Sequence, residues 1–562
     1  MLVAVTAGLQ WRNKMSNGPM LNAYPDSMGG TLDDIVKVLN KDDLKDVFES
    51  FYILPSIFNT DLDRGFSVID YGINEELGSR EAVEAIKNMD IDLKLDFILN
   101  HASVLSKEFQ DIIKNGDESK YKDFFIDWNK FWEGCGQMTE AGYIQPDEKY
   151  IKDMFFRKPG LPILMVRFPD GRNVPYWNTF YQEVRYKKLE AEDLMEKMDI
   201  QYVAATRLAE CVNAQIDEGK AVAELELGKY EKYHDAVVDL LESNRRYLGQ
   251  MDLNIKSPLV WEFYENTLKT LAGYGAKIVR LDAFAYAPKE PGEKNFLNDP
   301  GTWDLLQKVR ELADKNGVTL LPEIHASYGE KIYELVAGKG YMTYDFFLPG
   351  LLIHAIENHD SSLLVNWAKE LVEKDIRVVN MLGCHDGIPL LDLKGLLPED
   401  EIQKMIDTLV ARGGFVKDLH GAKNMYYQVN ATYYSALGED DKKMLFARAI
   451  QMFMPGKPQV WYLDLFAGKN DHEAVARAGA GGHKEINRTN LSLEQIESDL
   501  QKDVVKKQIE LLRLRKSHPA FGFDSKLSID TNGSVTSFTW TKGADSITLK
   551  ADFASLEYEI VK

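Results

Sequence analysis

The sequence predicts an α/β protein, a (β/α)8 TIM barrel with inserted subdomains after strands 3 and 7 and a small C-terminal antiparallel β domain. Short aliphatic strands alternate with amphipathic helices over most of the 562 residues, which is typical of a parallel sheet covered by helices. Eight such strands can be counted, and that number closes a barrel. Long interruptions of this alternation follow the third and seventh strands, and they indicate insertions at one end of the barrel.

The eight strands are expected at short runs rich in β-branched and aromatic residues. In chain order these runs are 21–26, 51–55, 93–99, 278–282, 318–325, 342–347, 376–382 and 459–463. Helices with apolar residues at a spacing of three and four are expected between them, among others at 32–39, 80–89 and 260–271.

The chain divides into six expected parts. They are the first part of the barrel at 1–101, an inserted subdomain at 102–255 with an extra helical segment at 189–246, the barrel continued at 256–390, a loop and helical insertion at 391–445, the end of the barrel at 446–520 and the C-terminal β domain at 521–562. Glu, Lys, Ala and Leu dominate 189–246, which predicts two or three surface helices. Polar and apolar residues alternate at 534–540 and 556–561, which predicts antiparallel strands.

The composition is that of a soluble globular protein, with a formal net charge of −21 from 67 basic and 88 acidic residues. Such an excess of negative charge disfavours nucleic acid and anionic membranes as partners. Cys135, Cys211 and Cys384 have no metal-ligand spacing and are too few for a disulfide framework, which favours a reducing compartment. No run approaches a membrane span, and residues 1–9 lack the basic start of a signal peptide. We therefore expect a cytoplasmic protein.

The run 279–286 contains the first candidate for chemistry. Val279 and Leu281 are aliphatic and follow a helical stretch, which predicts a short buried strand that delivers Asp282 into a cleft. Arg280 lies two residues earlier, so its side chain points to the same side of the strand and its positive charge would hold Asp282 ionised. An ionised, oriented carboxylate is suited to act as a nucleophile. A buried Arg–Asp pair that braces the barrel fits the pattern equally well.

Three acidic residues, Asp282, Glu323 and Asp386, stand at the carboxyl ends of expected strands. These ends converge on one face of a barrel, where catalytic residues gather. The apolar residues before Glu323 would raise its pKa and keep it protonated as an acid, while Asp282 stays ionised. That division of roles is the chemistry of a retaining glycosidase, whose two carboxyl groups lie about 5–5.5 Å apart. Any one of the three, taken alone, fits a structural carboxylate as well.

Two histidines also follow expected strands. His101 comes after the third strand and His385 precedes Asp386, so both are placed to donate hydrogen bonds to sugar hydroxyls. A neutral histidine in the core is the commoner alternative. Nothing in the chain has the ligand spacing of a zinc site or gathers the Asp and Asn ligands of a calcium loop, so neither a metal nor another cofactor is expected.

Four short motifs fall on the expected strands in a fixed order: Asp96 with Asn100-His101, Arg280-Leu281-Asp282-Ala283, Glu323, and His385-Asp386. Together they resemble the four sequence signatures of the α-amylase superfamily of glycoside hydrolases. The finer resemblance is to its sucrose phosphorylase branch, and it is carried by residues 54–55, 63–66, 158–162, 385–388, 428–437, 467–471 and 486–488.

The resemblance implies that Asp282 is the nucleophile, Glu323 the general acid/base and Asp386 the carboxylate that holds sugar hydroxyls in the transition state. It also implies a glucosyl site with Phe66 and Tyr286 as apolar walls. By position, the glucosyl unit would be held by Asp63, His101, Arg280, His385 and Arg488, and the acceptor side would be formed by Arg157, Tyr427 and Gln428.

The implied activity is glucosyl transfer from sucrose to inorganic phosphate, which gives α-glucose 1-phosphate and fructose through a covalent β-glucosyl intermediate on Asp282. Arg157 suits phosphate because its guanidinium is a rigid fork of donors. The implied partners are thus small-molecule substrates. Members of the branch include monomers and dimers, so a homodimer stays open.

Two features on the acceptor side are compatible with substrates other than sucrose. The helical segment 189–246 is longer than the connection usual in the branch, and the loop before Tyr427 is more basic. Lys417, His420 and Lys423 would suit a phosphorylated or acidic acceptor, unless they are ordinary solvated charges. The alternatives are phosphorolysis of sucrose 6′-phosphate, glucosylglycerol or glucosylglycerate, plain hydrolysis of an α-glucoside, and a carbohydrate-binding barrel without activity.

Overall fold

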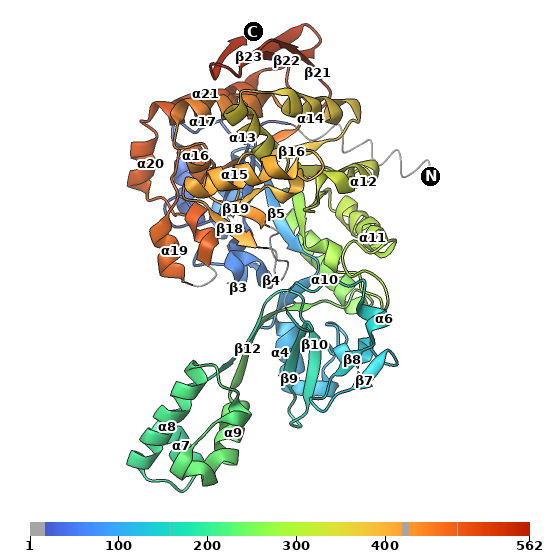
Figure 1. Ribbon diagram of the computed structural model, residues 1–562, viewed down its shortest axis with the longest axis vertical. Helices are drawn as coiled ribbons and strands as arrows, with labels where there is room; N and C mark the ends of the chain where they lie inside the picture. Colours follow the sequence, from blue (N-terminus) through green and yellow to red (C-terminus); the bar gives the residue numbers. More distant parts are fainter. Residues whose placement is uncertain (1–16, 158, 419–425, 480–481) are drawn as a thin grey trace.

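Eight parallel strands form one sheet at the centre of this computed structural model, which describes residues 17–157, 159–418, 426–479 and 482–562 (Figure 1). The strands neighbour one another in the order β14, β13, β5, β2, β1, β20, β16, β15. The edge strands β14 and β15 follow each other along the chain, and the sheet nearly closes into the predicted barrel. The strands are β1 (Met20–Ala23), β2 (Ser50–Ile53), β5 (Asp92–Ile98), β13 (Ala276–Asp282), β14 (Thr319–Pro322), β15 (Thr343–Asp345), β16 (Val378–Met381) and β20 (Lys457–Trp461).

Helices cover the outside of this sheet. In α2 (Leu32–Leu39), Leu32, Ile35 and Val38 are fully buried, and the Thr31 side chain caps the first turn by accepting a hydrogen bond from the Asp34 backbone N at 3.3 Å. The same pattern of an apolar face toward the sheet recurs around the barrel. The larger helices are α3 (Arg80–Asn88), α10 (Pro258–Gly273), α11 (Gly301–Lys315), α12 (Ile332–Gly338), α13 (Leu348–Asn358), α14 (Ser362–Glu373), α17 (Asp441–Phe453) and α21 (Asp503–Ser517).

The insertion after β5 begins with a compact part that packs near the barrel. Its aromatic core holds Trp128, Trp132 and Trp177, all fully buried. Figure 1 shows this part beside the opening of the barrel, below α10 and β4. Its elements include β6 (His101–Ser103), α4 (Lys107–Asn115), β7 (Gly136–Met138), β8 (Ile144–Pro146), β9 (Ile163–Arg167) and β10 (Asn173–Trp177).

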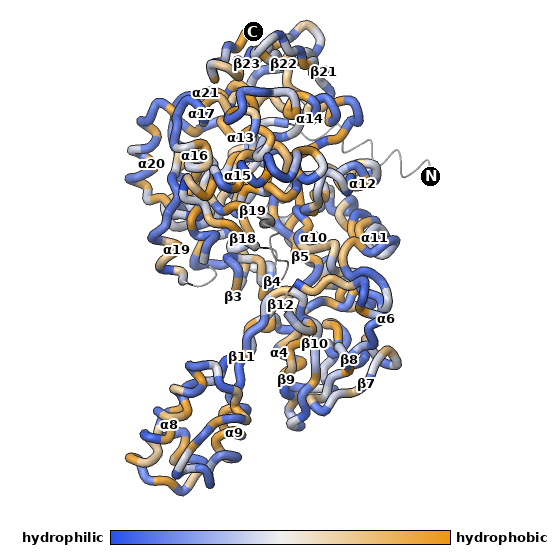
Figure 2. The backbone as a smooth tube through the Cα atoms, viewed as in Figure 1, coloured by the Kyte–Doolittle hydropathy of each residue, from blue (hydrophilic) through white to orange (hydrophobic). Residues whose placement is uncertain are grey.

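The second part of this insertion is a helical unit on a two-stranded stem. The antiparallel strands β11 (Gln182–Tyr186) and β12 (Arg245–Asp252) form the stem, and the helices extend from it away from the barrel (Figure 1). Apolar and hydrophilic segments alternate along these helices (Figure 2), and a separate core includes Leu194, Leu208 and Leu241. Where the sequence predicts two or three surface helices, the structure has α7 (Ala191–Lys197), α8 (Tyr202–Asp217) and α9 (His234–Ser243).

The insertion after β16 forms a small antiparallel sheet next to the pocket described below. β19 (Tyr426–Asn430) lies between β17 (Ile388–Pro389) and β18 (Phe415–Asp418), and α15 (Glu399–Ala411) connects β17 to β18. This sheet carries Gln428 toward the barrel opening. His420 and Lys423 lie outside the described residues, as do the side chains of Lys417 and Tyr427.

The chain ends in the predicted antiparallel β sheet. Its strands are β21 (Lys526–Asn532), β22 (Val535–Lys542), β23 (Asp545–Asp552) and β24 (Glu557–Val561), paired in that order. The sheet packs on α17, where the Trp540 indole donates to the Phe453 backbone oxygen at 2.8 Å and the rings of Phe446 and Phe553 lie 5.0 Å apart. Figure 1 shows this sheet at the end of the molecule opposite to the helical part of the insertion after β5.

The described residues form neither a helix suited to a membrane nor a cluster suited to a metal ion. None of the helices in those parts of the chain combines the length and the apolar content needed to cross a membrane. Likewise, the described side chains contain no group of three or more His, Cys, Asp or Glu residues arranged to hold a metal ion.

Candidate active site

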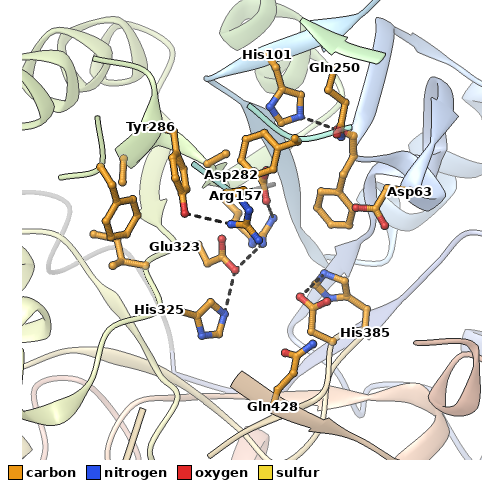
Figure 3. Close-up of a pocket in the computed structure, with 18 of the residues that line it drawn as sticks. Asp63, His101, Arg157, Gln250, Asp282, Tyr286, Glu323, His325, His385 and Gln428 are labelled. Atoms are coloured by element: carbon orange, nitrogen blue, oxygen red, sulfur yellow. Dashed lines mark hydrogen bonds and ion pairs between the residues drawn. The ribbon is translucent and has the colours of Figure 1, made fainter. Parts of the chain in front are cut away.

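A pocket at the carboxyl ends of the barrel strands collects most of the predicted site residues (Figure 3). Asp282 ends β13, Glu323 directly follows β14, and Asp386 follows β16, as expected for three converging strand ends. Of the other predicted residues, those that line the pocket are Asp63, Phe66, His101, Arg157, Arg280, Tyr286, His385 and Gln428. Arg488 lies behind this lining, against His385 and Asp386. Tyr427 is on β19, and its side chain is outside the described part.

Arg280 organises the two central carboxylates from inside the barrel. Its Nη1 lies 3.0 Å from Oδ1 of Asp282, and its Nη2 lies 3.0 Å from Oε1 of Glu323. In the parallel pairing of β13 and β5, Arg280 stands opposite Asp96, and the two side chains form a fully buried ion pair. Tyr52 donates to the other oxygen of Asp96 at 2.8 Å. One guanidinium therefore braces the barrel through Asp96 and orients the two pocket carboxylates.

The pKa values of Asp282 and Glu323 differ from those expected from the sequence. Burial raises the pKa of Asp282, against the opposing effect of Arg280, and the charge of Glu323 raises it further. Burial also acts to raise the pKa of Glu323, but Arg280 and a hydrogen bond from His325 outweigh it, so that pKa is lowered. The expectation of a raised pKa for Glu323 was wrong, because the apolar run before Glu323 matters less than the two cations that reach its carboxylate. The expectation that Arg280 keeps Asp282 ionised was also wrong for this structure, because burial outweighs the charge of Arg280.

His325 was not predicted as a site residue. Its Nε2 lies 3.4 Å from Oε1 of Glu323, and its Nδ1 lies 3.0 Å from Oδ2 of Asp392. The ring also stacks on Phe346 at 3.8 Å between centroids. Burial alone would lower the pKa of His325, but Asp392 and then Glu323 raise it to about 10. Glu323 thus sits between two positive groups.

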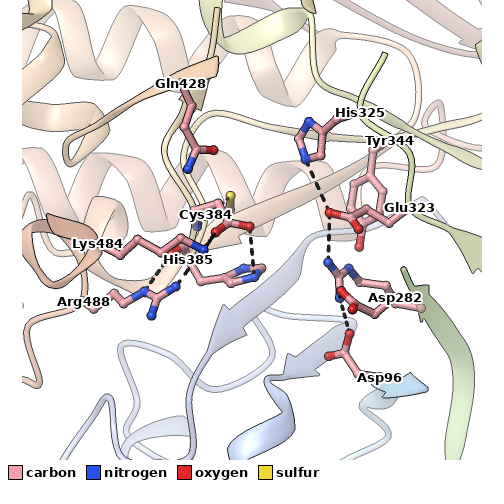
Figure 4. A network of polar contacts seen from close by, with 12 residues as sticks. Asp96, Asp282, Glu323, His325, Tyr344, Cys384, His385, Gln428, Lys484 and Arg488 are labelled. Carbon is pink, nitrogen blue, oxygen red and sulfur yellow. Dashed lines mark hydrogen bonds and ion pairs between the residues drawn. The ribbon is translucent and has the colours of Figure 1, made fainter. Parts of the chain in front are cut away.

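Asp386 belongs to a second cluster of charges, whose members His385, Lys484 and Arg488 lie apart from Asp282 and Glu323 in Figure 4. Its Oδ1 pairs with the Lys484 ammonium, and its Oδ2 lies 3.4 Å from Nε2 of His385. Arg488 lies 3.9 Å from Asp386 and donates through Nε to the His385 backbone oxygen at 2.8 Å. Burial would raise the pKa of Asp386, but Lys484, His385 and Arg488 hold it well below its ordinary value. Asp386 is therefore a carboxylate acceptor, ready for hydroxyl groups.

Neutral histidines and aromatic rings form the wall beside these charges. Burial lowers the pKa of His385 to about 3 and also lowers the pKa of His101. His101 donates through Nε2 to the Phe66 backbone oxygen at 3.0 Å, and Gln250 donates to the same oxygen at 3.0 Å. The Phe66 ring stacks on His385 at 5.2 Å between centroids. Both histidines therefore present neutral, fixed rings to the pocket.

The loop before Phe66 holds a strained backbone at the edge of the pocket. Asp63 and Arg64 both have φ of 51°, a left-handed conformation that is costly for residues other than glycine. Arg64 fixes it by donating to Asp26 at 2.9 Å and to the Arg488 backbone oxygen at 3.1 Å. At Gly65 a side chain would clash, since a Cβ would lie 2.2 Å from the Ser56 backbone N. The loop thus presents Asp63 to the pocket in one orientation.

The opposite rim of the pocket combines a cation with aromatic rings. Arg157 donates through Nη1 to the Tyr286 hydroxyl at 3.1 Å, and its guanidinium lies 5.0 Å from the Phe180 ring centroid. The Tyr286 ring contacts Phe180 and Phe296 at centroid distances of 5.4 and 4.7 Å. A positive group held on a rigid aromatic wall suits an anionic ligand.

Comparison with known proteins places this geometry in a family. No protein-family model matches the chain. The chain is 48% identical over 556 residues to a sucrose 6(F)-phosphate phosphorylase of Ilumatobacter coccineus, with 97% of this chain and 96% of the relative covered. The chain belongs to the sucrose phosphorylase branch of the α-amylase superfamily.

Two further comparisons agree with this placement. A sucrose phosphorylase of Streptococcus mutans is 30% identical over 525 residues, with 92% of each chain covered. The crystal structure of a sucrose 6F-phosphate phosphorylase from Thermoanaerobacter thermosaccharolyticum superimposes with a TM-score of 0.79 at 31% identity, covering 97% of this chain and 95% of that one. As a member of this branch, the chain is a glycosyltransferase that acts as a disaccharide phosphorylase on small-molecule substrates.

The sequence analysis did not predict several of the residues that line the pocket. His325 carried a usable signal, since it lies two residues after Glu323 at a strand end and so tends to the same side. No signal in the sequence indicated Lys484, because its contact with Asp386 joins two segments that are 98 residues apart. The remaining additions are mostly aromatic or amide side chains, namely Phe155, Phe180 and Gln250 from the insertion after β5 and Phe296 from the loop between β13 and α11.

Proposed function

We propose that the chain transfers the glucosyl unit of sucrose 6(F)-phosphate, whose phosphate is on the fructose ring, to inorganic phosphate. The products would be α-glucose 1-phosphate and fructose 6-phosphate. The observation that carries the proposal is the 48% identity over nearly the whole chain to a relative with that activity in its name. The basic positions Lys417, His420 and Lys423 fit a phosphorylated acceptor.

The proposed reaction uses the carboxylates in two steps with net retention. In the first step, Asp282 attacks the anomeric carbon while Glu323 gives its proton to the departing fructosyl oxygen. In the second step, an oxygen of phosphate attacks the anomeric carbon of the β-glucosyl ester, Asp282 leaves, and the acceptor proton returns to Glu323. The acid role requires a protonated Glu323, and a leaving-group oxygen placed against it would favour that form by accepting its hydrogen bond.

Asp386 supports the transition state in this proposal. Because Lys484 and Arg488 keep it ionised, it would accept hydrogen bonds from glucosyl hydroxyls that strengthen as positive charge develops at the anomeric carbon. Arg157, beside Tyr286 at the rim, would receive the phosphate that replaces the fructosyl group.

The test is release of α-glucose 1-phosphate from sucrose 6(F)-phosphate and from sucrose, each with and without inorganic phosphate. The proposal predicts phosphate-dependent release with a kcat/KM at least about tenfold higher for the phosphorylated donor, which corresponds to one additional ionic contact. Equal or better use of sucrose would favour the second candidate, a sucrose phosphorylase, which the Streptococcus mutans relative supports. Release of free glucose regardless of phosphate would contradict both.

A further inference from the structure

Lys289 is a fully buried lysine that the proposed chemistry does not use. Its ammonium lies 2.7 Å from Oδ2 of Asp252, 3.0 Å from Oδ1 of Asn100 and 2.6 Å from the backbone oxygen of Tyr286. An ammonium has three N–H donors, and these three oxygens use all of them. A charge this deeply buried is tolerated only when it is paired and fully hydrogen-bonded, as it is here.

The three oxygens come from three parts of the chain that meet behind the pocket wall. Asn100 follows β5 of the barrel, Asp252 ends β12 of the insertion, and Tyr286 ends the short turn η6 (Phe284–Tyr286) after the nucleophile strand. Another residue of the insertion also binds Asp252. The backbone N and the hydroxyl of Thr179 donate hydrogen bonds to the two carboxylate oxygens of Asp252 at 2.8 and 2.6 Å. The Lys289 ammonium thus joins the barrel, the insertion and the turn.

Tyr286 extends this junction to the acceptor side of the pocket. Lys289 holds its backbone oxygen, and its side-chain hydroxyl accepts the hydrogen bond from Arg157 at 3.1 Å. The nucleophile has a different support, because Arg280 orients Asp282 from inside the barrel. The two sides of the site are therefore fixed by two separate buried cations.

We propose that Lys289 is a positioning residue for the acceptor side, whose ammonium fixes Tyr286 and through it places Arg157 against the incoming phosphate. The inference rests on the proposed function and deepens it, since it assigns acceptor recognition to a residue that touches no substrate. It predicts that loss of the ammonium weakens phosphate binding while formation of the glucosyl intermediate continues.

The test uses the full-length enzyme with α-glucosyl fluoride as donor. The measured rates then depend neither on binding of a fructosyl group nor on its protonation as a leaving group. Lys289→Met alone would leave Asp252 as an unpaired buried charge, so the informative variant is the charge-balanced pair Lys289→Met with Asp252→Asn. Lys256→Met is the matched control, because its ammonium pairs with Glu290 on the surface nearby. Hydrolysis without phosphate and the KM for inorganic phosphate are both measured.

In the double variant we expect hydrolysis within about threefold of the wild-type rate and a KM for phosphate raised about tenfold or more. An unchanged KM in the folded variant would overturn the inference, and so would equal losses in hydrolysis and phosphate use. In Lys289→Ala, ethylammonium should lower the KM again, whereas tetramethylammonium, which has the charge without N–H donors, should not. Equal effects of the two ions would also overturn it.

The outcomes for the two proposals are distinguishable. If the wild-type enzyme forms no glucose 1-phosphate from α-glucosyl fluoride and phosphate, the proposed function fails. If the wild type is phosphate-dependent and the double variant keeps its KM, only the role of Lys289 fails.

Discussion

The charge of Asp392 should control the protonation of His325 beside Glu323, the proposed general acid. Asp392→Asn keeps the shape of the side chain but removes the charge that lies 3.0 Å from Nδ1 of His325. A charge-assisted hydrogen bond of this kind contributes about 1.5–3 kcal/mol. At about 1.36 kcal/mol per pKa unit, we expect the pKa of His325 to fall by about 1–2 units from its value of about 10.

The sign of the pH dependence follows from this raised pKa. Because the pKa of His325 in the folded protein lies above its ordinary value of 6.5, the stabilisation is fully present below that pH and is lost as the pH rises toward about 10. With an unfolding entropy of about 2.1 cal/mol/K per residue over 562 residues, Asp392→Asn should lower the Tm by about 1–3 °C near pH 6. Near pH 10 the difference should largely disappear.

Two measurements check this prediction. Calorimetry at the two pH values gives the Tm difference, and NMR titration of histidine labelled with nitrogen-15 follows the His325 ring, assigned with a His325→Gln variant. Asp407→Asn is the control, because Asp407 is exposed on α15 and its carboxylate accepts a hydrogen bond from the Gln403 side chain. A Tm difference that is the same at both pH values, or an unchanged His325 titration, would refute the reasoning.

Three further variants address the other groups of the site. Glu323→Gln should slow transfer from the fructosyl leaving group by about 10²–10⁴-fold and much less from α-glucosyl fluoride, and equal losses would contradict the acid role. Arg157→Ala should raise the KM for phosphate and spare hydrolysis; an unaltered KM would place the anion elsewhere. Lys484→Met should raise the pKa of Asp386 and so move the acid limb of the kcat/KM profile to higher pH, while a fixed limb would show that Lys484 does not hold Asp386 ionised.

The parts of the site that follow from local geometry could be predicted from the sequence. Residues two apart on a strand share a side, so Arg280 and Asp282 could be placed together from their spacing alone. The convergence of Asp282, Glu323 and Asp386 needed only the count of strands and the rule that barrel strands end at one face. The family resemblance supplied the rest of the predicted lining.

What the sequence could not give depends on contacts between distant segments. The lowered pKa of Glu323 results from Arg280 on the neighbouring strand and from His325, which Asp392 in a later insertion keeps charged. Lys289 meets Asp252 only because the insertion folds back on the barrel. Such effects require the positions of side chains in space, since the electrostatic effect of each charge depends on its distance and burial.

The central claim, that Asp282 carries the glucosyl unit, is tested most directly by trapping the intermediate. Without phosphate, Glu323→Gln should accept the glucosyl unit from α-glucosyl fluoride and release it slowly to water, because the base that activates water is missing. Rapid acid quench and peptide mass spectrometry should then find one hexosyl group on the peptide that contains Asp282. A hexosyl group on another carboxylate, or turnover to glucose 1-phosphate by an Asp282→Ala variant at the wild-type rate, would contradict the account.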